Sequence, residues 1–412
     1  MTDPVSRSLR LDSGTTYMLV ATVLAAVAAY LFQLVVGRAL GPTDFAPLTV
    51  LWTVQFLVST TVLMPMEQLT VRRLNLDAPG APPWRLYLSV VAAAALGATV
   101  FTAATLDRLF GGEAAYLPVV AALVLLYGGY ALGRGYLAGR RRFKEYALCT
   151  FFESGLRLAL AGVLLAMGVG ALGLGWTLVT GSLVVWLWRP LSGERRRAAG
   201  ATREVGAAAA LAGFVAANAA AQSIVAAGPL VVAALGAGPA EVSVFFQTFL
   251  LLRAPLTVAY NLVSRIMPPV TRLVEQGETT RIRRLVAGIG AAGAALAAAG
   301  FAAGYAVGPA LVQLLLGAEY RPGALLAALA ASGAVLATVA LFAQQMLIAM
   351  RATGRLAAAW LAGLAAAALS VAIGQAAPSL RVGWAFLIGE VLAFTLLVSA
   401  TLARHRPRAG SS

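Results

Sequence analysis

The chain has 412 residues, of which 60% are hydrophobic and only 11% are charged, and its mean hydropathy is +0.84. Soluble domains carry about a quarter charged residues, so this chain lacks the polar groups that would cover a water-exposed surface. A membrane-spanning helix needs about 20 mostly apolar residues, and the hydrophobic residues suffice for about twelve such helices. The composition therefore indicates an all-α, polytopic membrane protein.

Three residue types that occur only once exclude several kinds of chemistry. Cys149 is the only cysteine and His405 the only histidine, so neither a disulfide framework nor a histidine-ligated metal site nor a Ser-His-Asp arrangement is available. The only lysine, Lys144, follows three arginines and does not lie in a phosphate-binding loop. We therefore expect no metal, no cofactor and no enzymatic activity.

Hydropathy along the chain predicts twelve membrane spans. Six lie near residues 14–36, 46–66, 85–106, 115–137, 146–167 and 170–190. Six more lie near residues 205–235, 241–265, 285–308, 323–349, 355–376 and 383–403. We therefore predict two six-helix halves, residues 1–204 and residues 205–412, of which the second ends in a short basic tail. The connecting segments are short and leave no room for a soluble catalytic domain.

Basic residues gather in alternate loops. These loops and the two ends hold 24 of the 31 basic residues, and the loops on the opposite side hold four, Arg38, Arg108, Arg321 and Arg381. Cationic loops resist translocation, so we predict an inner-membrane protein with both termini in the cytoplasm. This topology also accounts for the net charge of +15 without nucleic acid. The arginines at 140–142 and 195–197 are candidates to contact anionic membrane lipids.

A weak internal repeat relates the two halves. Ala39-Leu40-Gly41-Pro42-Thr43-Asp44 follows the first span, and Ala234-Leu235-Gly236-Ala237-Gly238-Pro239-Ala240-Glu241 follows the seventh. In both places a helix ends, a Gly/Pro turn follows, and an acidic residue opens the next helix. Repeats of six spans share one orientation, so their axis lies along the membrane normal. Two halves related in this way predict a central cleft between them.

Four charged residues lie within the predicted spans, where charge is costly and commonly functional. Glu153 and Arg157 are one helical turn apart and can form an ion pair; this pair is either structural or part of ion coupling. Arg253 has no acidic residue within reach on its own helix, so it either bridges to Glu390 or binds an anionic group in the cleft. Arg134, at a helix end, is a fifth, weaker candidate.

Amide side chains occur on corresponding helices of the two halves, the first and second and the seventh and eighth. They are Gln33, Gln55, Asn218, Gln222, Gln247 and Asn261. We predict that these residues, with Arg253, line a central cleft suited to a hydroxyl-rich substrate. The alternative is that each amide only joins helices by hydrogen bonds, at about 0.6–2 kcal/mol per bond.

Three short stretches resemble motifs of a known family. The stretch Gly37-Arg38-Ala39-Leu40-Gly41-Pro42-Thr43-Asp44-Phe45 resembles the Arg-x-Leu-Gly-Pro-x-Asp/Glu-Phe/Tyr-Gly signature of polysaccharide flippases. These flippases belong to the multidrug, oligosaccharidyl-lipid and polysaccharide exporter superfamily. Leu316-Gly317-Ala318-Glu319-Tyr320-Arg321-Pro322 resembles that family's Gly-x-x-Tyr turn, and Gln345-Met346-Leu347-Ile348-Ala349-Met350 its Leu-x-Ala stretch. The sequence departs from the pattern at Ala46, and the absence of arginine from the first span argues against the lipid II flippase branch.

The resemblance implies an alternating-access flippase that moves a polyprenyl-diphosphate-linked oligosaccharide to the outer leaflet for envelope or exopolysaccharide synthesis. It implies a lipid-linked glycan as substrate and glycosyltransferases or a polymerase as partners. Glu153 and Glu390 are then the available carriers of a coupling proton or cation.

Three alternatives stay open at this point. A cation-coupled multidrug exporter of the same superfamily is expected to have acidic residues in the first or seventh helix and aromatic cavity walls. A membrane polymerase or ligase needs a longer external loop than the sequence provides. A non-transporting membrane scaffold in cell-wall assembly is the third.

Overall fold

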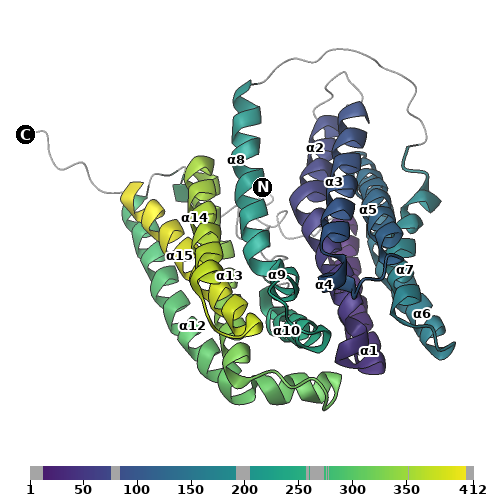
Figure 1. The fold of residues 1–412 in the computed structure, drawn as a ribbon. Helices are drawn as coiled ribbons and strands as arrows, with labels where there is room; N and C mark the ends of the chain where they lie inside the picture. Colours follow the sequence, from purple (N-terminus) through teal and green to yellow (C-terminus); the bar gives the residue numbers. More distant parts are fainter. Residues whose placement is uncertain are drawn as a thin grey trace, which may run out of the picture. The chain divides into compact units, whose positions relative to one another are not determined.

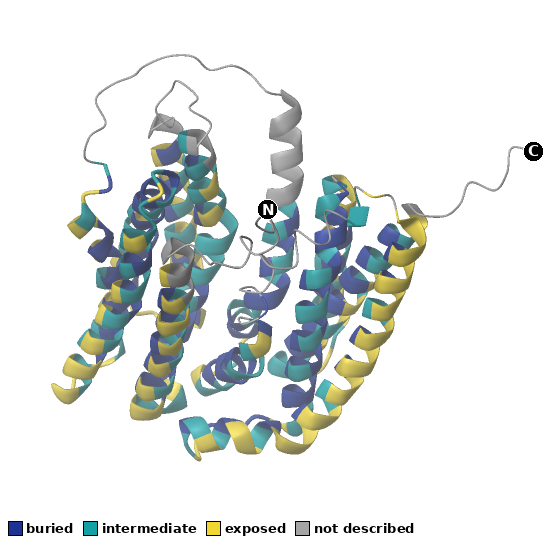
Figure 2. Cartoon of the chain, turned by 180° about the vertical axis from the view of Figure 1, so that it is seen from behind, coloured by how far each residue is buried: buried dark blue, intermediate teal, exposed yellow. Residues whose placement is uncertain are grey.

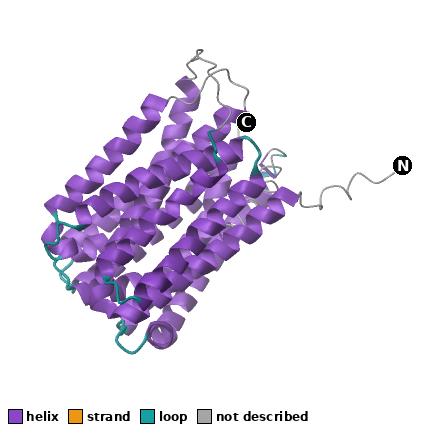
Figure 3. Cartoon of the chain, turned by 90° about the vertical axis from the view of Figure 1, so that its right-hand side faces the viewer, coloured by secondary structure: helices purple, strands orange, loops and turns teal. Residues whose placement is uncertain are grey.

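A computed structural model describes residues 13–75, 84–191, 205–256, 259, 273–274, 276, 278–350 and 352–404. Within these ranges the regular secondary structure is entirely helical, and the helices are joined by short loops (Figure 3). The predicted all-α class is therefore confirmed.

The chain forms two compact units that do not simply follow chain order. Unit 1 comprises Met1–Leu40, Val62–Leu106 and Glu113–Thr202; unit 2 comprises Gly41–Thr61, Asp107–Gly112 and Arg203–Ser412. Two short segments of the first half thus pack with the second. The division into six-helix halves at residue 204 stays a prediction.

The first helix contains a break that divides it between the units. Helix α1 (Ser13–Val58) has non-helical dihedral angles at Gly41, with φ 74° and ψ 170°. This region of backbone space is essentially restricted to glycine. Pro42 follows at the position where proline favours the start of a helix. The helix that begins there continues through a π-helical segment, η2 (Ser59–Leu63), into α2 (Met64–Asn75).

Unit 1 is organised around α5 (Tyr116–Gly139), which packs against the surrounding helices (Figure 1). Its neighbours are α2, α3 (Trp84–Ala104), α6 (Phe143–Ala166), α7 (Ala171–Gly181) and the 3₁₀ helix η3 (Ser182–Trp188). The short α4 (Leu106–Phe110) leads out of this unit. Gly128 allows α3 to approach α5 closely, because a Cβ there would lie 2.4 Å from Val91 Cγ1.

Unit 2 is organised around α13 (Ala324–Ala349), which packs against α10, α12, α14 and α15. The helices of this unit are α8 (Val205–Ala226), α9 (Gly228–Ala234), α10 (Pro239–Leu252), α12 (Thr279–Leu316), α14 (Thr353–Ile373) and α15 (Pro378–Arg404). Gly304 lets α12 lie directly against α13, since a Cβ there would be 2.7 Å from the Ala327 carbonyl oxygen.

These helices account for the twelve predicted spans. Nine described helices are long and apolar enough to cross a membrane, and the bent pair α8–α9 supplies a tenth. One of the nine, Val20–Val71, contains the Gly41 break and therefore holds two predicted spans. The shorter apolar helix α10 falls on the eighth. The twelve-span polytopic architecture is therefore confirmed.

Large apolar side chains cover the surfaces that would face lipid. On α12, Leu296, Val307 and Leu314 are exposed, and the exposed face continues along the helix (Figure 2). In a membrane such side chains lie against acyl chains and carry no solubility cost. Most residues of α13, in contrast, are buried.

Candidate functional site

A broken helix in unit 2 positions the most informative charged residue. Helices α8 and α9 meet at a 59° bend between Ala226 and Gly228. A bend interrupts the backbone ladder, so carbonyl groups near it need other donors. Arg253 supplies one: its Nη1 donates to the Val225 carbonyl oxygen at 3.2 Å. Helix α10 ends immediately before Arg253, as the nearby Pro255 predicts.

Beside this bend lies a cavity of about 280 Å³. Its walls come from the part of α1 that follows Gly41 and from α8, α9, α10, α14 and α15, all within unit 2. Six aromatic residues contribute to the walls, Trp52, Phe56, Phe245, Phe246, Phe249 and Phe386. Arg253 is the one charged residue among the described lining residues, and its guanidinium lies 5.3 Å from the Phe56 ring centre. The cavity therefore combines apolar walls with a single permanent cation.

Of the residues predicted to line a substrate cleft, Arg253 lines this cavity, and the described amides are not among its lining residues. Asn218 Nδ2 donates to the Thr60 carbonyl oxygen at 2.9 Å, in the π-helical segment. Gln222 and Gln247 are buried in unit 2, and Gln33 is buried in unit 1. A role for these amides in a central cleft stays a prediction.

Two further predicted amides give less information. Gln55 is partly exposed on the part of α1 that follows Gly41, and its Oε1 has no hydrogen-bond partner among the described residues. Asn261 lies outside the described residues.

Glu390 is buried and has no hydrogen-bond partner among the described residues. Its side chain on α15 is 0% exposed, and neither carboxylate oxygen has a hydrogen-bond partner in the described part of the chain. Phe386 and Phe394 lie one turn before and after it and contact Gly333 of α13 and Gly293 of α12. The acid thus sits on the face of α15 that packs into unit 2. The predicted alternative of an Arg253–Glu390 bridge is not formed.

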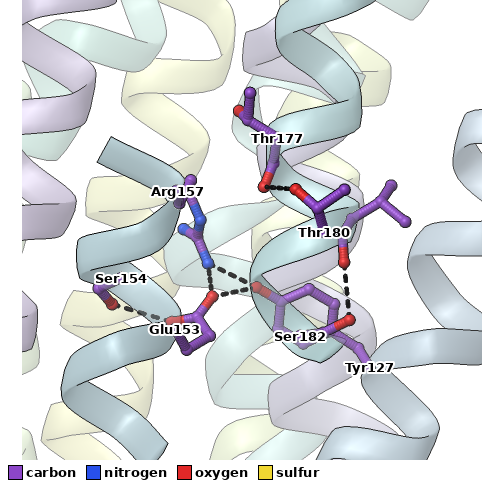
Figure 4. A network of polar contacts seen from close by, with 8 residues as sticks. Tyr127, Glu153, Ser154, Arg157, Thr177, Thr180 and Ser182 are labelled. Atoms are coloured by element: carbon purple, nitrogen blue, oxygen red, sulfur yellow. Dashed lines mark hydrogen bonds and ion pairs between the residues drawn. The ribbon is translucent and has the colours of Figure 1, made fainter. Parts of the chain in front are cut away.

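Glu153 and Arg157 form the predicted ion pair, deep within unit 1 (Figure 4). Both are nearly fully buried. Tyr127 and Ser154 donate hydrogen bonds to the two Glu153 oxygens, the latter at 2.9 Å, and Arg157 also donates to the Tyr127 hydroxyl. The Glu153 carboxylate is therefore neutralised and hydrogen-bonded within its own unit.

A second polar cluster, which is partly buried, was not predicted from the sequence. Arg134 Nη2 lies 3.2 Å from Glu67 Oε1, and the Tyr146 hydroxyl donates to the same oxygen at 3.1 Å. The Arg134 guanidinium also stacks over the Tyr146 ring at 4.6 Å. The three residues come from α2, α5 and α6, so spacing along one helix gives no sign of this pair.

Two of the three stretches that carry the family resemblance meet in space. A Cβ at Gly41 would lie 2.8 Å from Glu319 Oε2, so the carboxylate rests directly against the glycine backbone. Tyr320, in the loop after α12, is buried. Burial raises the pKa of its phenol, and the adjacent Glu319 carboxylate acts in the same direction. The phenol therefore stays protonated at neutral pH.

Two mycobacterial proteins are similar to this chain in sequence. No family model matches the sequence. An uncharacterized protein of Mycobacterium bovis is 29% identical over 337 residues, covering 78% of this chain and 77% of the relative. An uncharacterized protein of Mycobacterium tuberculosis shows the same identity and coverage.

Solved structures give a longer match. The inward-facing structure of a multidrug resistance MATE family transporter of the MOP superfamily has a TM-score of 0.61 at 14% identity, covering 93% of this chain and 94% of that one. The outward-facing structure of such a transporter has a TM-score of 0.52 at 15% identity, covering 98% of both chains. A variant of a Vibrio cholerae MATE transporter has a TM-score of 0.51 at 13% identity, covering 93% and 98%. The chain has the fold of the MATE family transporters.

Proposed function

We propose that this protein is an alternating-access transporter of amphipathic anions that flips a polyprenyl-diphosphate-linked oligosaccharide across the cytoplasmic membrane. The cavity in unit 2 carries the proposal, because its apolar walls surround a single guanidinium within a MATE-type fold. A polyprenyl diphosphate joins an apolar chain to anionic phosphates, and guanidinium groups bind phosphate in a bidentate manner. The cavity matches the junction between lipid and phosphate.

The volume of the cavity supports binding of only part of such a substrate. At about 280 Å³ it lies below the usual range of small-molecule pockets, about 300–1,000 Å³. A lipid-linked oligosaccharide is far larger, so its sugar would lie outside these walls. Glycosyltransferases or a polymerase would supply or consume the substrate on the two sides of the membrane.

Glu390 is the proposed carrier of the coupling proton. An isolated buried carboxylate is very costly as an anion, and Glu390 has no hydrogen-bond partner among the described residues. A carboxyl group in such a place takes up a proton in the closed interior and releases it when water reaches it. Glu153 is less suited to this role, because Arg157 already neutralises it.

Export of apolar drug-like anions is a second candidate function. The six aromatic side chains of the cavity wall provide a feature expected of a multidrug exporter. The charge beside them is a cation, so this function would select anionic rather than cationic compounds. The sugar is therefore what separates the two candidates.

Transport into proteoliposomes tests both candidates. We expect purified protein to flip a fluorescent polyprenyl-diphosphate oligosaccharide, and Arg253→Ala to reduce the rate at least tenfold while Arg253→Lys retains part of it. Arg355→Ala, which removes an exposed arginine of α14 in the same unit, is the control and is expected to leave the rate unchanged. Full activity of Arg253→Ala contradicts the cavity as the binding site. Transport of an apolar anion without the glycolipid favours the second candidate.

A further inference from the structure

Two arginines adopt a backbone conformation that favours glycine. Arg141 has φ 56° and Arg189 has φ 44°, and they are the two non-glycine residues with positive φ in the described part of the chain. The left-handed region is unfavourable for residues that carry a Cβ. Both residues follow the end of a helix, Arg141 after α5 and Arg189 after η3. A shared deviation of this kind points to a use for the side chains.

Other helix ends in the same chain show what the backbone alone would favour. After α5, Arg142 N donates to the Leu137 carbonyl at 2.8 Å, and Arg141 takes the left-handed position of this Schellman motif. After α6, the same bond runs from Val169 N to the Leu164 carbonyl at 2.9 Å, with Gly168 in the left-handed position. The left-handed position of this motif is therefore glycine after α6 and arginine after α5.

The loops that hold the two arginines are joined to each other. Arg140 Nη1 donates to the Pro190 carbonyl and Arg142 Nη2 donates to the Trp188 carbonyl, each at 3.4 Å. The two acceptor carbonyls belong to the residues directly before and after Arg189, all within unit 1. Arg141, Lys144 and Arg189 are exposed beside these bonds. Three cationic side chains thus share one end of unit 1.

An exposed apolar and aromatic band adjoins the cations. The Trp188 and Phe152 rings lie 6.2 Å apart, and Phe152 and Leu187 are 47% and 77% exposed. Tryptophan and other amphipathic aromatic side chains favour the level of the lipid headgroups. The cations therefore lie where a headgroup would be, with acyl chains alongside Leu187.

We propose that Arg141, Lys144 and Arg189 form a binding site for the headgroup of an anionic phospholipid at the predicted cytoplasmic end of unit 1. The phosphate would accept hydrogen bonds from the two guanidinium groups, and the acyl chains would lie against Phe152 and Leu187. A role limited to membrane topology explains the charge of the loops but not the left-handed backbone, because topology depends on charge anywhere in a short loop. The site is independent of what the protein transports.

The test measures lipid binding without transport. Full-length protein in neutral detergent is titrated with phosphatidylglycerol, phosphatidylcholine or inorganic phosphate, and its thermal unfolding midpoint is followed, since a ligand that binds the native state raises it. We expect phosphatidylglycerol to raise the midpoint and the double variant Arg141→Gly/Arg189→Gly to lose at least half of that shift. Without added lipid, the same variant is expected to unfold at a higher temperature than the original chain, because glycine fits the backbone better.

Two variants make the result specific. Arg141→Lys/Arg189→Lys keeps the charges and is expected to keep most of the shift. Arg283→Gln/Arg284→Gln removes two exposed arginines from α12 in unit 2 and is expected to keep all of it. An equal loss in this control, an undiminished shift in the glycine variant, or an equal response to inorganic phosphate overturns the proposal.

Discussion

The two units differ in how charged side chains inside the helical packing are paired. In unit 1, Glu153 pairs with Arg157, and Glu67 pairs with Arg134, each pair with tyrosine hydroxyls as additional partners. In unit 2, Glu390 is buried without a hydrogen-bond partner among the described residues, and Arg253 reaches a helix carbonyl beside a cavity.

The contrast separates structural charges from candidates for mechanism. In each ion pair of unit 1 the acid and the base neutralise one another, so the pair can join helices without binding a proton or a substrate. A proton would stabilise a buried acid that has no partner. An anionic ligand would stabilise a cation that faces a cavity. Unit 1 therefore holds the charges that join helices, and unit 2 holds the groups that can respond to a substrate or a proton.

The largest expected effect comes from breaking a pair in unit 1. Arg157→Ala leaves the Glu153 carboxylate buried without its cation, and loss of one partner of a buried pair costs about 3–5 kcal/mol. We expect a correspondingly lower free energy of unfolding, measured by denaturation in detergent. The double variant Glu153→Gln/Arg157→Met removes both charges and is expected to recover most of the loss. If the double variant is as unstable as Arg157→Ala, the pair is not what stabilises this region.

An effect of opposite sign is expected in unit 2. Glu390→Met replaces an acid that has no hydrogen-bond partner in the described part of the chain with an apolar side chain, and an unsatisfied buried polar group costs about 1–3 kcal/mol. We therefore expect the free energy of unfolding to rise by a similar amount. Transport driven by a proton gradient is expected to be lost at the same time. A fall in stability would show that the carboxyl group has a partner in the membrane and would remove the contrast between the units.

The smallest effect concerns Asn218, which joins helix α8 to the π-helical segment. Asn218→Ala removes the hydrogen bond to the Thr60 carbonyl, and such bonds contribute about 0.6–2 kcal/mol in membranes. We expect a loss of stability within that range. A loss of transport without a loss of stability would instead support the predicted place of Asn218 in a substrate cleft.

Sequence reasoning succeeded where the relevant distance lies along the chain. The Glu153–Arg157 pair follows from its four-residue spacing on one helix, and the twelve spans follow from local hydropathy. The Glu67–Arg134 pair depends on how α2 packs against α5, so no local spacing predicts it. The aromatic cavity likewise joins residues from six helices, among them Trp52 and Phe386, that are far apart in the sequence.

The assignment of Gly41–Thr61 to unit 2 has a consequence for dividing the gene. A cut between residues 191 and 205 divides the two predicted halves, but the N-terminal fragment would carry Gly41–Thr61 away from the unit in which it packs. The C-terminal fragment would lack Trp52 and Phe56 from its cavity wall. The N-terminal fragment would hold essentially all of unit 1, but the C-terminal fragment would hold an incomplete unit 2. Activity would therefore require both fragments in the same membrane, with residues 41–61 of the first completing unit 2 of the second.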